Sequence, residues 1–135
     1  MQPPAHLTFI NPPTLPGPPG YTPVVAVSGG RMIYIAGQVP IDRHGNLVGA
    51  GDLRVQTEQV FSNLQAALAA AGATFAHVVK LNYYLLDADQ VAVVRAVRDA
   101  FVNTEFPPAS TLVEVRRLVR AEFLIEIEAT ASVPL

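Results

Sequence analysis

The segment Phe123–Val133 alternates apolar residues with mostly polar ones, and no other feature of the chain constrains its fold as strongly. Successive side chains of a β-strand point to opposite faces of the sheet. One face of this strand carries two charged residues, Glu126 and Glu128. The other face is apolar and consists of Phe123, Ile125, Ile127, Ala129 and Ala131. A sheet built around this strand must bury the apolar face under other elements and leave the charged face to water or to other subunits.

Two helices are predicted upstream of this strand. The first begins at Asp52, a residue type that caps helix N-termini, and ends before Gly72, which suits the position after a helix C-terminus. The second begins after Asp87, with Gln90 at the spacing of a capping box, and ends before Phe106–Pro108. Apolar residues recur at helical spacing in both, namely Val60, Phe61, Leu64, Leu68 and Ala71 in the first and Val91, Val94, Val97 and Phe101 in the second.

Four further strands are predicted, at Val24–Val27, Met32–Ala36, Val78–Leu86 and Thr111–Arg117. The first two form a hairpin across a turn that contains Gly29 and Gly30. The element order is therefore ββαβαββ. Because two helices cannot cover both faces of such a sheet, both should pack on the face of Ile125 and Ile127, which gives an α+β fold.

The chain divides into a short arm and a single domain. Residues 1–23 hold eight of the twelve prolines, so we expect an irregular arm, because proline lacks the N–H that helices and sheets require. Residues 24–135 suffice for one domain with its own core. The segment Val60–Val79 has no formal charge but contains polar groups such as Ser62 and Gln65, so we expect a buried helix and strand, with no membrane span. No basic and apolar leader is visible, so no signal peptide is expected.

Composition limits the partners that the chain can have. Half of the residues are hydrophobic and only 15% are charged, whereas about a quarter of a typical soluble domain is charged. The protein is either a rather apolar monomer or, as we favour, an obligate oligomer that hides a second face. A net charge of −2 argues against a nucleic-acid partner, which needs a basic patch. The absence of cysteine excludes disulfides and thiol chemistry and fits a reducing compartment such as the cytoplasm.

Four segments resemble, in order, motifs of the RidA/YjgF (Rid) family, whose members are also called L-PSP proteins. They are Gly20–Tyr21, Ile35–Pro40, Pro107–Val115 and Ile125–Ala129. The second is similar to the family pattern SGQ(V/I)P, the third to PAR(S/T)xVxV and the fourth to IEIEA. Each segment alone is a weak signal, but together they cover nearly all of the chain from Tyr21 onward with the family's spacing.

This resemblance implies a chorismate-mutase-like fold assembled as a homotrimer, with small-molecule clefts between its subunits. It also implies hydrolysis of reactive imines and enamines, such as 2-aminoacrylate, without a cofactor. In the family, the arginine of PAR binds the substrate carboxylate, and a glutamate of IEIEA positions water and moves protons. No metal is expected, because His6, His44 and His77 lack the spacing of metal ligands.

The resemblance assigns Glu126 as the candidate catalytic residue, in the place of the family's water-positioning glutamate. The alternative is a solvated glutamate on an open sheet face. Glu128 has the same orientation but does not stand in the place of the water-positioning glutamate, and it is interpreted as structural. Tyr21 matches a ligand-binding tyrosine of the cleft, or else it is a packing ring that pins the arm. Gly37 matches a glycine whose backbone approaches the ligand, a role compatible with a bend in the strand.

The chain departs from the family at Ser110, which stands where the arginine of PAR is expected. Leu112 stands where some members have cysteine. The cleft then lacks its fixed positive anchor, because serine has one hydroxyl and no charge, and this departure puts typical 2-aminoacrylate deaminase activity in doubt. Arg95 stands where characterised members often have asparagine. It either supplies a relocated positive charge or pairs with Asp99 on the helix surface.

Three functions are therefore hypotheses. The first is a cofactor-independent hydrolase, or deaminase, of imines, enamines or a related small metabolite, in which Glu126 activates water in an inter-subunit cleft. The second is a non-catalytic trimer that binds or scavenges a small molecule in the same cleft. The third, endoribonuclease or translation inhibitor, is a label often attached to the family, and the acidic charge balance argues against it.

Overall fold

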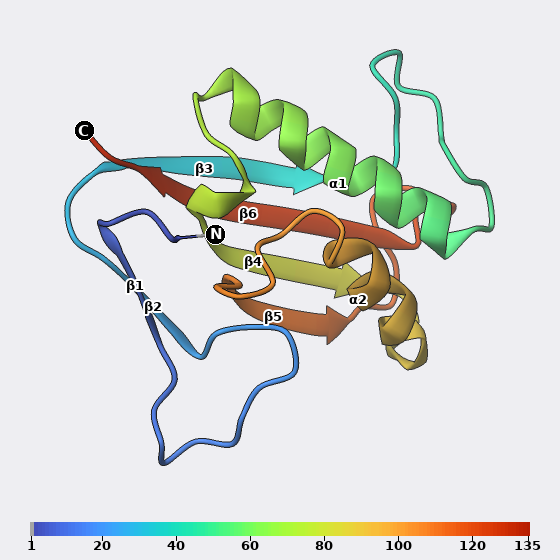
Figure 1. Ribbon diagram of the computed structural model, residues 1–135. Helices are drawn as coiled ribbons and strands as arrows, with labels where there is room; N and C mark the ends of the chain where they lie inside the picture. The colour runs from blue at the N-terminus through green and yellow to red at the C-terminus, as the bar shows by residue number, and fades with distance from the viewer. Residues whose placement is uncertain (1) are drawn as a thin grey trace.

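The computed structural model describes residues 2–135 and has a main sheet covered on one side by helices (Figure 1). Its strands are β1 (Leu7–Ile10), β2 (Val24–Val27), β3 (Arg31–Gln38), β4 (Val78–Leu85), β5 (Ala109–Glu114) and β6 (Ile125–Val133). Its helices are α1 (Leu53–Ala70) and α2 (Val91–Arg98), with 3₁₀ turns at Phe75–His77 and Ala88–Gln90. The main sheet has the order β3-β6-β4-β5, in which β4 and β5 are parallel and β6 is antiparallel to β3 and β4. The predicted α+β fold class is confirmed.

The N-terminal arm contains a strand, so the prediction of an irregular arm is wrong in this part. β1 pairs with β2 in a separate antiparallel ribbon, which Figure 1 shows beside the main sheet. The predicted hairpin between β2 and β3 is also wrong, because β3 pairs with β6. Prolines flank Leu7–Ile10 without interrupting it, so its backbone N–H groups remain available for pairing. Gly29 and Gly30, with φ of 75° and 95°, turn the chain from the ribbon into the sheet.

Asp52 caps α1 as predicted, but Asp87 caps the 3₁₀ turn Ala88–Gln90, so α2 begins later than predicted, at Val91. The Asp52 side chain accepts a hydrogen bond from the backbone N–H of Val55 at 3.1 Å. Gly72 follows α1 with a φ of 77°. In the 3₁₀ turn before α2, Gln90 Nε2 donates to Asp87 Oδ2 at 3.1 Å. Within residues 2–135, no helix is long and apolar enough to cross a membrane.

The core lies between the helices and the face of β6 that carries Ile125 and Ile127, as the alternation predicted. Both isoleucines are fully buried. Full burial of such a side chain stabilises the fold by about 1.5–3 kcal/mol. α2 ends earlier than predicted, at Arg98, yet Phe101 still joins the core, because its ring stacks on that of Phe61 with centroids 5.2 Å apart.

A buried glutamine fixes where β6 begins. Gln56 of α1 is completely buried, and its Nε2 donates to the carbonyl oxygens of Gly49 at 3.1 Å and Glu122 at 3.0 Å. Its Oε1 accepts from the backbone N–H of Leu124 at 2.8 Å. Leaving a buried backbone group unpaired costs about 1–3 kcal/mol, so these bonds tie α1 to the entrance of β6. They thereby set the position of Glu126, two residues further along.

No helix among residues 2–135 covers the opposite face of the main sheet (Figure 1), although His6 of the N-terminal arm contacts Ser132 at its end and Ser132 is completely buried. Tyr34 and Met32 of β3 are 79% and 40% exposed, and Val113 of β5 is 42% exposed. Glu126 and Glu128 point to the same face, since they alternate with the buried residues of β6. The sheet therefore presents a surface, here called the open face, that carries exposed apolar side chains on its two edge strands and two carboxylates on β6 between them.

Candidate active site

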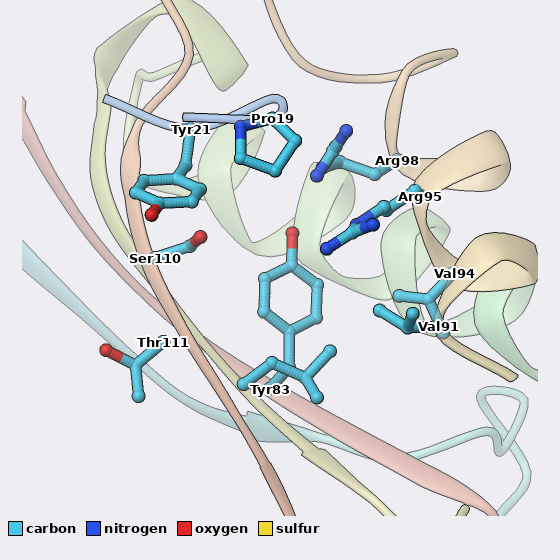
Figure 2. Close-up of a pocket in the computed structure, with 10 residues that line it drawn as sticks. Pro19, Tyr21, Tyr83, Val91, Val94, Arg95, Arg98, Ser110 and Thr111 are labelled. Atoms are coloured by element: carbon cyan, nitrogen blue, oxygen red, sulfur yellow. The ribbon is translucent and has the colours of Figure 1, made fainter. Parts of the chain in front are cut away.

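A cavity of about 300 Å³ opens at the edge of the main sheet, between β5, α2 and the N-terminal arm (Figure 2). Val91 and Val94 form an apolar part of its wall. The residues that bring polar or bulky groups to it are Tyr21, Tyr83, Arg95, Arg98, Ser110 and Leu112. The structure therefore brings four of the sequence-predicted ligand-binding residues, Tyr21, Arg95, Ser110 and Leu112, into one place, here called the edge pocket.

Strand register determines which face of the sheet holds the edge pocket. β5 lies at the edge of the sheet, with Ser110 beside Leu81 and Leu112 beside Tyr83 of β4. Leu81 and Tyr83 are buried under the helices. Neighbouring residues on paired strands point the same way, so Ser110 and Leu112 also point to the helix-covered side.

The N-terminal arm is fixed over the edge pocket by contacts with the loop before β5. The hydroxyl of Thr22 donates to the carbonyl oxygen of Pro107 at 2.6 Å. Gly20, with a φ of 83°, lies against the guanidinium of Arg98, where an added Cβ would overlap the arginine. These contacts hold Tyr21 at the pocket, where Figure 2 shows its ring above Ser110.

The two arginines of the edge pocket have different partners. Arg98 forms an ion pair with Asp99, with an N–O distance of 2.9 Å. The alternative in which Arg95 pairs with Asp99 is therefore wrong. Arg95 is exposed and has no ion-pair partner among residues 2–135. It consequently brings an uncompensated positive charge to the side of the pocket facing Ser110.

Tyr83 places a buried hydroxyl at the floor of the edge pocket. The residue is 4% exposed, and its hydroxyl has no hydrogen-bond partner among residues 2–135. Figure 2 shows this hydroxyl directed between Tyr21 and the two arginines. Burial raises the pKa of the hydroxyl, which therefore remains protonated at neutral pH. Sequence interpretation missed Tyr83, because its inward position in β4 is typical of a core residue.

The remaining predicted site residues, Gly37 and Glu126, meet on the open face. The register between β3 and β6 shifts between Ile35 and Gln38, which is a β-bulge that includes Gly37. A Cβ added to Gly37 would overlap Oε2 of Glu126. Glycine at this bulge therefore lets the carboxylate lie directly against the backbone of β3.

The two carboxylates of β6 have different surroundings. Glu128 Oε1 accepts hydrogen bonds from the hydroxyl of Tyr84 at 2.7 Å and from Nδ2 of Asn82 at 3.1 Å. Glu126 has no hydrogen-bonding side chain of this kind among residues 2–135. Burial, and to a lesser extent the charge of Glu128, raise the pKa of the Glu126 carboxyl. Glu126 is thus suited to exchange protons, whereas Glu128 is held by its neighbours.

The predicted site residues therefore form two groups on opposite faces of the sheet in one subunit. The edge pocket contains Tyr21, Arg95, Ser110 and Leu112, and the open face contains Gly37 and Glu126. Within residues 2–135, no three His, Asp or Glu side chains are grouped so that they could hold a metal ion.

The fold and the site define a small α+β protein with a ligand-sized site. Its mixed sheet has helices on one face and a partly exposed carboxylate on the other, and a pocket with two arginines lies at the sheet edge. The sequence profile of the Endoribonuclease L-PSP family matches residues 18–133. The chain therefore belongs to this family, which is also called RidA/YjgF, and the resemblance noted in the sequence is confirmed.

Curated relatives and solved structures agree with this assignment. A RutC family protein of Pyrococcus horikoshii is 41% identical over 78% of this chain and 82% of its own length. A 2-iminobutanoate/2-iminopropanoate deaminase of Salmonella typhimurium is 37% identical over 80% of this chain and 84% of its own length. The crystal structure of YyfB from Yersinia pestis, described as a Rid family protein of unknown function, is 37% identical. It superposes with a TM-score of 0.83 and covers 95% of this chain and 99% of its own.

Proposed function

We propose that this protein is a cofactor-independent hydrolase of reactive imines or enamines that works in clefts between the subunits of a homotrimer. The observation that carries the proposal is the position of Glu126, a carboxylate with a raised pKa, against the Gly37 bulge on the open face. The identity to a named 2-iminobutanoate/2-iminopropanoate deaminase supports the choice of reaction. No observation favours RNA cleavage, and the net charge of −2 argues against it. The proposed compartment is the cytoplasm.

The proposed reaction needs one group that both accepts and donates a proton. Glu126 removes a proton from water as the water oxygen bonds to the imine carbon, and it passes this proton to the imine nitrogen, which gives a tetrahedral intermediate with a hydroxyl and an amino group. Glu126 then moves the hydroxyl proton to the nitrogen as the C–N bond breaks, a C=O bond forms and ammonia leaves. Water and imine thus give an oxo compound and ammonia, with no redox change. A carboxyl with a raised pKa suits both steps, because its two protonation states are closer in population near neutral pH.

The two groups of site residues support an arrangement in which neighbouring subunits share each cleft. The edge pocket and Glu126 lie on opposite faces of one subunit, so a ligand in the pocket cannot contact Glu126 of the same chain. In a closed ring, the open face of one subunit lies against a different surface of the next. Each cleft would then take its edge pocket from one subunit and its Glu126 from the neighbour.

A homotrimer is expected in solution, because the open face exposes Met32, Tyr34 and Val113 in the isolated subunit. Large apolar side chains that are exposed on a sheet face without a covering helix indicate an interface with another subunit. Multi-angle light scattering at micromolar concentration should give three times the subunit mass of 14.4 kDa. A mass of one subunit under these conditions would refute the shared cleft.

Imine hydrolysis is tested directly with 2-iminobutanoate made in the cuvette by an amino-acid oxidase acting on 2-aminobutanoate. Semicarbazide traps the imine that remains, so the enzyme should lower the trapped fraction and speed ammonia release. The control is the same mixture with heat-inactivated protein. No acceleration with this imine or with an uncharged imine of the same size would exclude the hydrolase and leave a binding or scavenging trimer.

A further inference from the structure

We infer that Tyr83 and Arg95 form an anion subsite in the edge pocket, which holds the carboxylate of a small 2-imino or 2-oxo acid with a short apolar side chain. The inference rests on the proposed function for its substrate class. It assigns roles to residues of this chain at a site where Ser110 cannot supply charge.

The buried hydroxyl of Tyr83 is the first observation. The residue is 4% exposed, its hydroxyl has no partner among residues 2–135, and Figure 2 shows it directed into the cavity. A buried polar group without a hydrogen bond costs the fold free energy. A neutral phenol can donate one hydrogen bond, and a carboxylate oxygen in the pocket would accept it. An anion bound in the pocket would therefore supply the hydrogen-bond partner that this hydroxyl lacks among residues 2–135.

The charge of Arg95 is the second observation. Arg98 is compensated by Asp99 at 2.9 Å and is packed under Gly20, whereas Arg95 has no such partner among residues 2–135. Figure 2 shows the guanidinium of Arg95 extending toward the hydroxyl of Tyr83. A guanidinium and a carboxylate form charge-assisted hydrogen bonds, which are stronger than neutral ones. Arg95 is therefore the group that selects an anion over a neutral ligand.

The rest of the edge pocket selects the size and polarity of the acid. Val91, Val94 and Leu112 give an apolar wall, and a cavity of about 300 Å³ is at the small end of ligand sites. The short side chain of Ser110 leaves space in the pocket, and its hydroxyl offers a second neutral hydrogen bond. This combination fits an acid of a few carbon atoms with an unbranched or singly branched apolar chain.

The test is calorimetric titration of the folded protein with 2-oxobutyrate, with 2-butanone as a neutral probe of similar size. Arg95→Gln is expected to weaken 2-oxobutyrate binding about 10- to 100-fold, and Tyr83→Phe about 2- to 10-fold. Tyr84→Phe is the matched control, because Tyr84 bonds to Glu128 on the open face and should leave affinity unchanged. 2-Butanone should bind much more weakly than the acid and should not respond to Arg95→Gln.

Two results would overturn the anion subsite. One is the absence of 2-oxobutyrate binding by wild-type protein that does hydrolyse imines. The other is binding that stays within twofold of wild type in both Arg95→Gln and Tyr83→Phe. A different result would contradict the proposed function alone. If 2-oxobutyrate binds in an Arg95-dependent manner but no imine is hydrolysed, the anion subsite stands and the hydrolase is wrong. Glu126→Gln separates the two roles further, since it should keep the affinity for 2-oxobutyrate while losing hydrolysis.

Discussion

Glu126→Gln is expected to lower the rate of imine hydrolysis about 10²–10⁴-fold, the usual cost of losing a positioned acid/base. Glu128→Gln should retain most of the rate. Both residues lie on the same face of β6, but only Glu126 lies against the Gly37 bulge. Glutamine at 128 keeps an oxygen that can accept from Tyr84 and Asn82, so this variant is a close control. The measurement is the initial rate of ammonia release from 2-iminobutanoate.

Stability provides an independent readout of the same variant. The pKa of Glu126 is raised in the folded protein, chiefly by burial. The stability that the protonated Glu126 carboxyl contributes is therefore fully present below the pKa that this group has in the unfolded chain. It is lost as pH rises through the higher pKa that the group has in the folded protein, so the free energy of unfolding falls. Glu126→Gln should leave the free energy of unfolding nearly unchanged at pH 3.5, below the unfolded value of about 4.3, and raise it at pH 7. A variant that is inactive but at least as stable as wild type at pH 7 has lost chemistry, not folding.

Similar small effects of Glu126→Gln and Glu128→Gln on ammonia release would contradict the catalytic role of Glu126. A large effect of Glu128→Gln alone would transfer the role to Glu128. Tyr84→Phe then identifies whether the hydrogen bond of 2.7 Å between Tyr84 and Glu128 contributes to it.

Regular local patterns explain what the sequence could predict. The alternation in β6 identified its buried face, and the capping residue Asp52 with Gly72 gave the limits of α1 to within two residues. Strand pairing was harder, because β-propensity does not say which strand is the partner. The four residues of β1 lie among prolines, and their pairing with β2 depends on long-range contacts that no local pattern encodes.

The candidate site was predicted as a set of residues but not as an arrangement. Ser110 and Glu126 were expected to share a cleft between subunits, and only the strand register shows that they lie on opposite sides of one sheet, so that a shared cleft needs two chains. Tyr83 was missed because a tyrosine between Leu81 and Leu85 is typical of a core strand. Only the tertiary structure reveals that its hydroxyl meets a cavity and finds no partner among residues 2–135.

The proposed site depends on two subunits, and mixing two defective variants tests this directly. One variant is Glu126→Gln, with an intact edge pocket, and the other is Arg95→Gln, with an intact Glu126. They are unfolded, mixed in equal amounts, refolded together and assayed at low imine concentration. In a ring where each cleft joins two neighbours, about a quarter of the clefts then combine an intact pocket with an intact carboxylate.

The mixture should therefore recover about a quarter of the wild-type rate of ammonia release, although each variant refolded alone stays nearly inactive. Light scattering of the mixture confirms that the trimers have reassembled, and refolded wild-type protein gives the reference rate. If Glu126 and Arg95 acted on a substrate within the same subunit, no cleft in the mixture would hold both residues. A rate in the fully reassembled mixture no higher than the mean of the two variants would contradict a cleft shared between subunits.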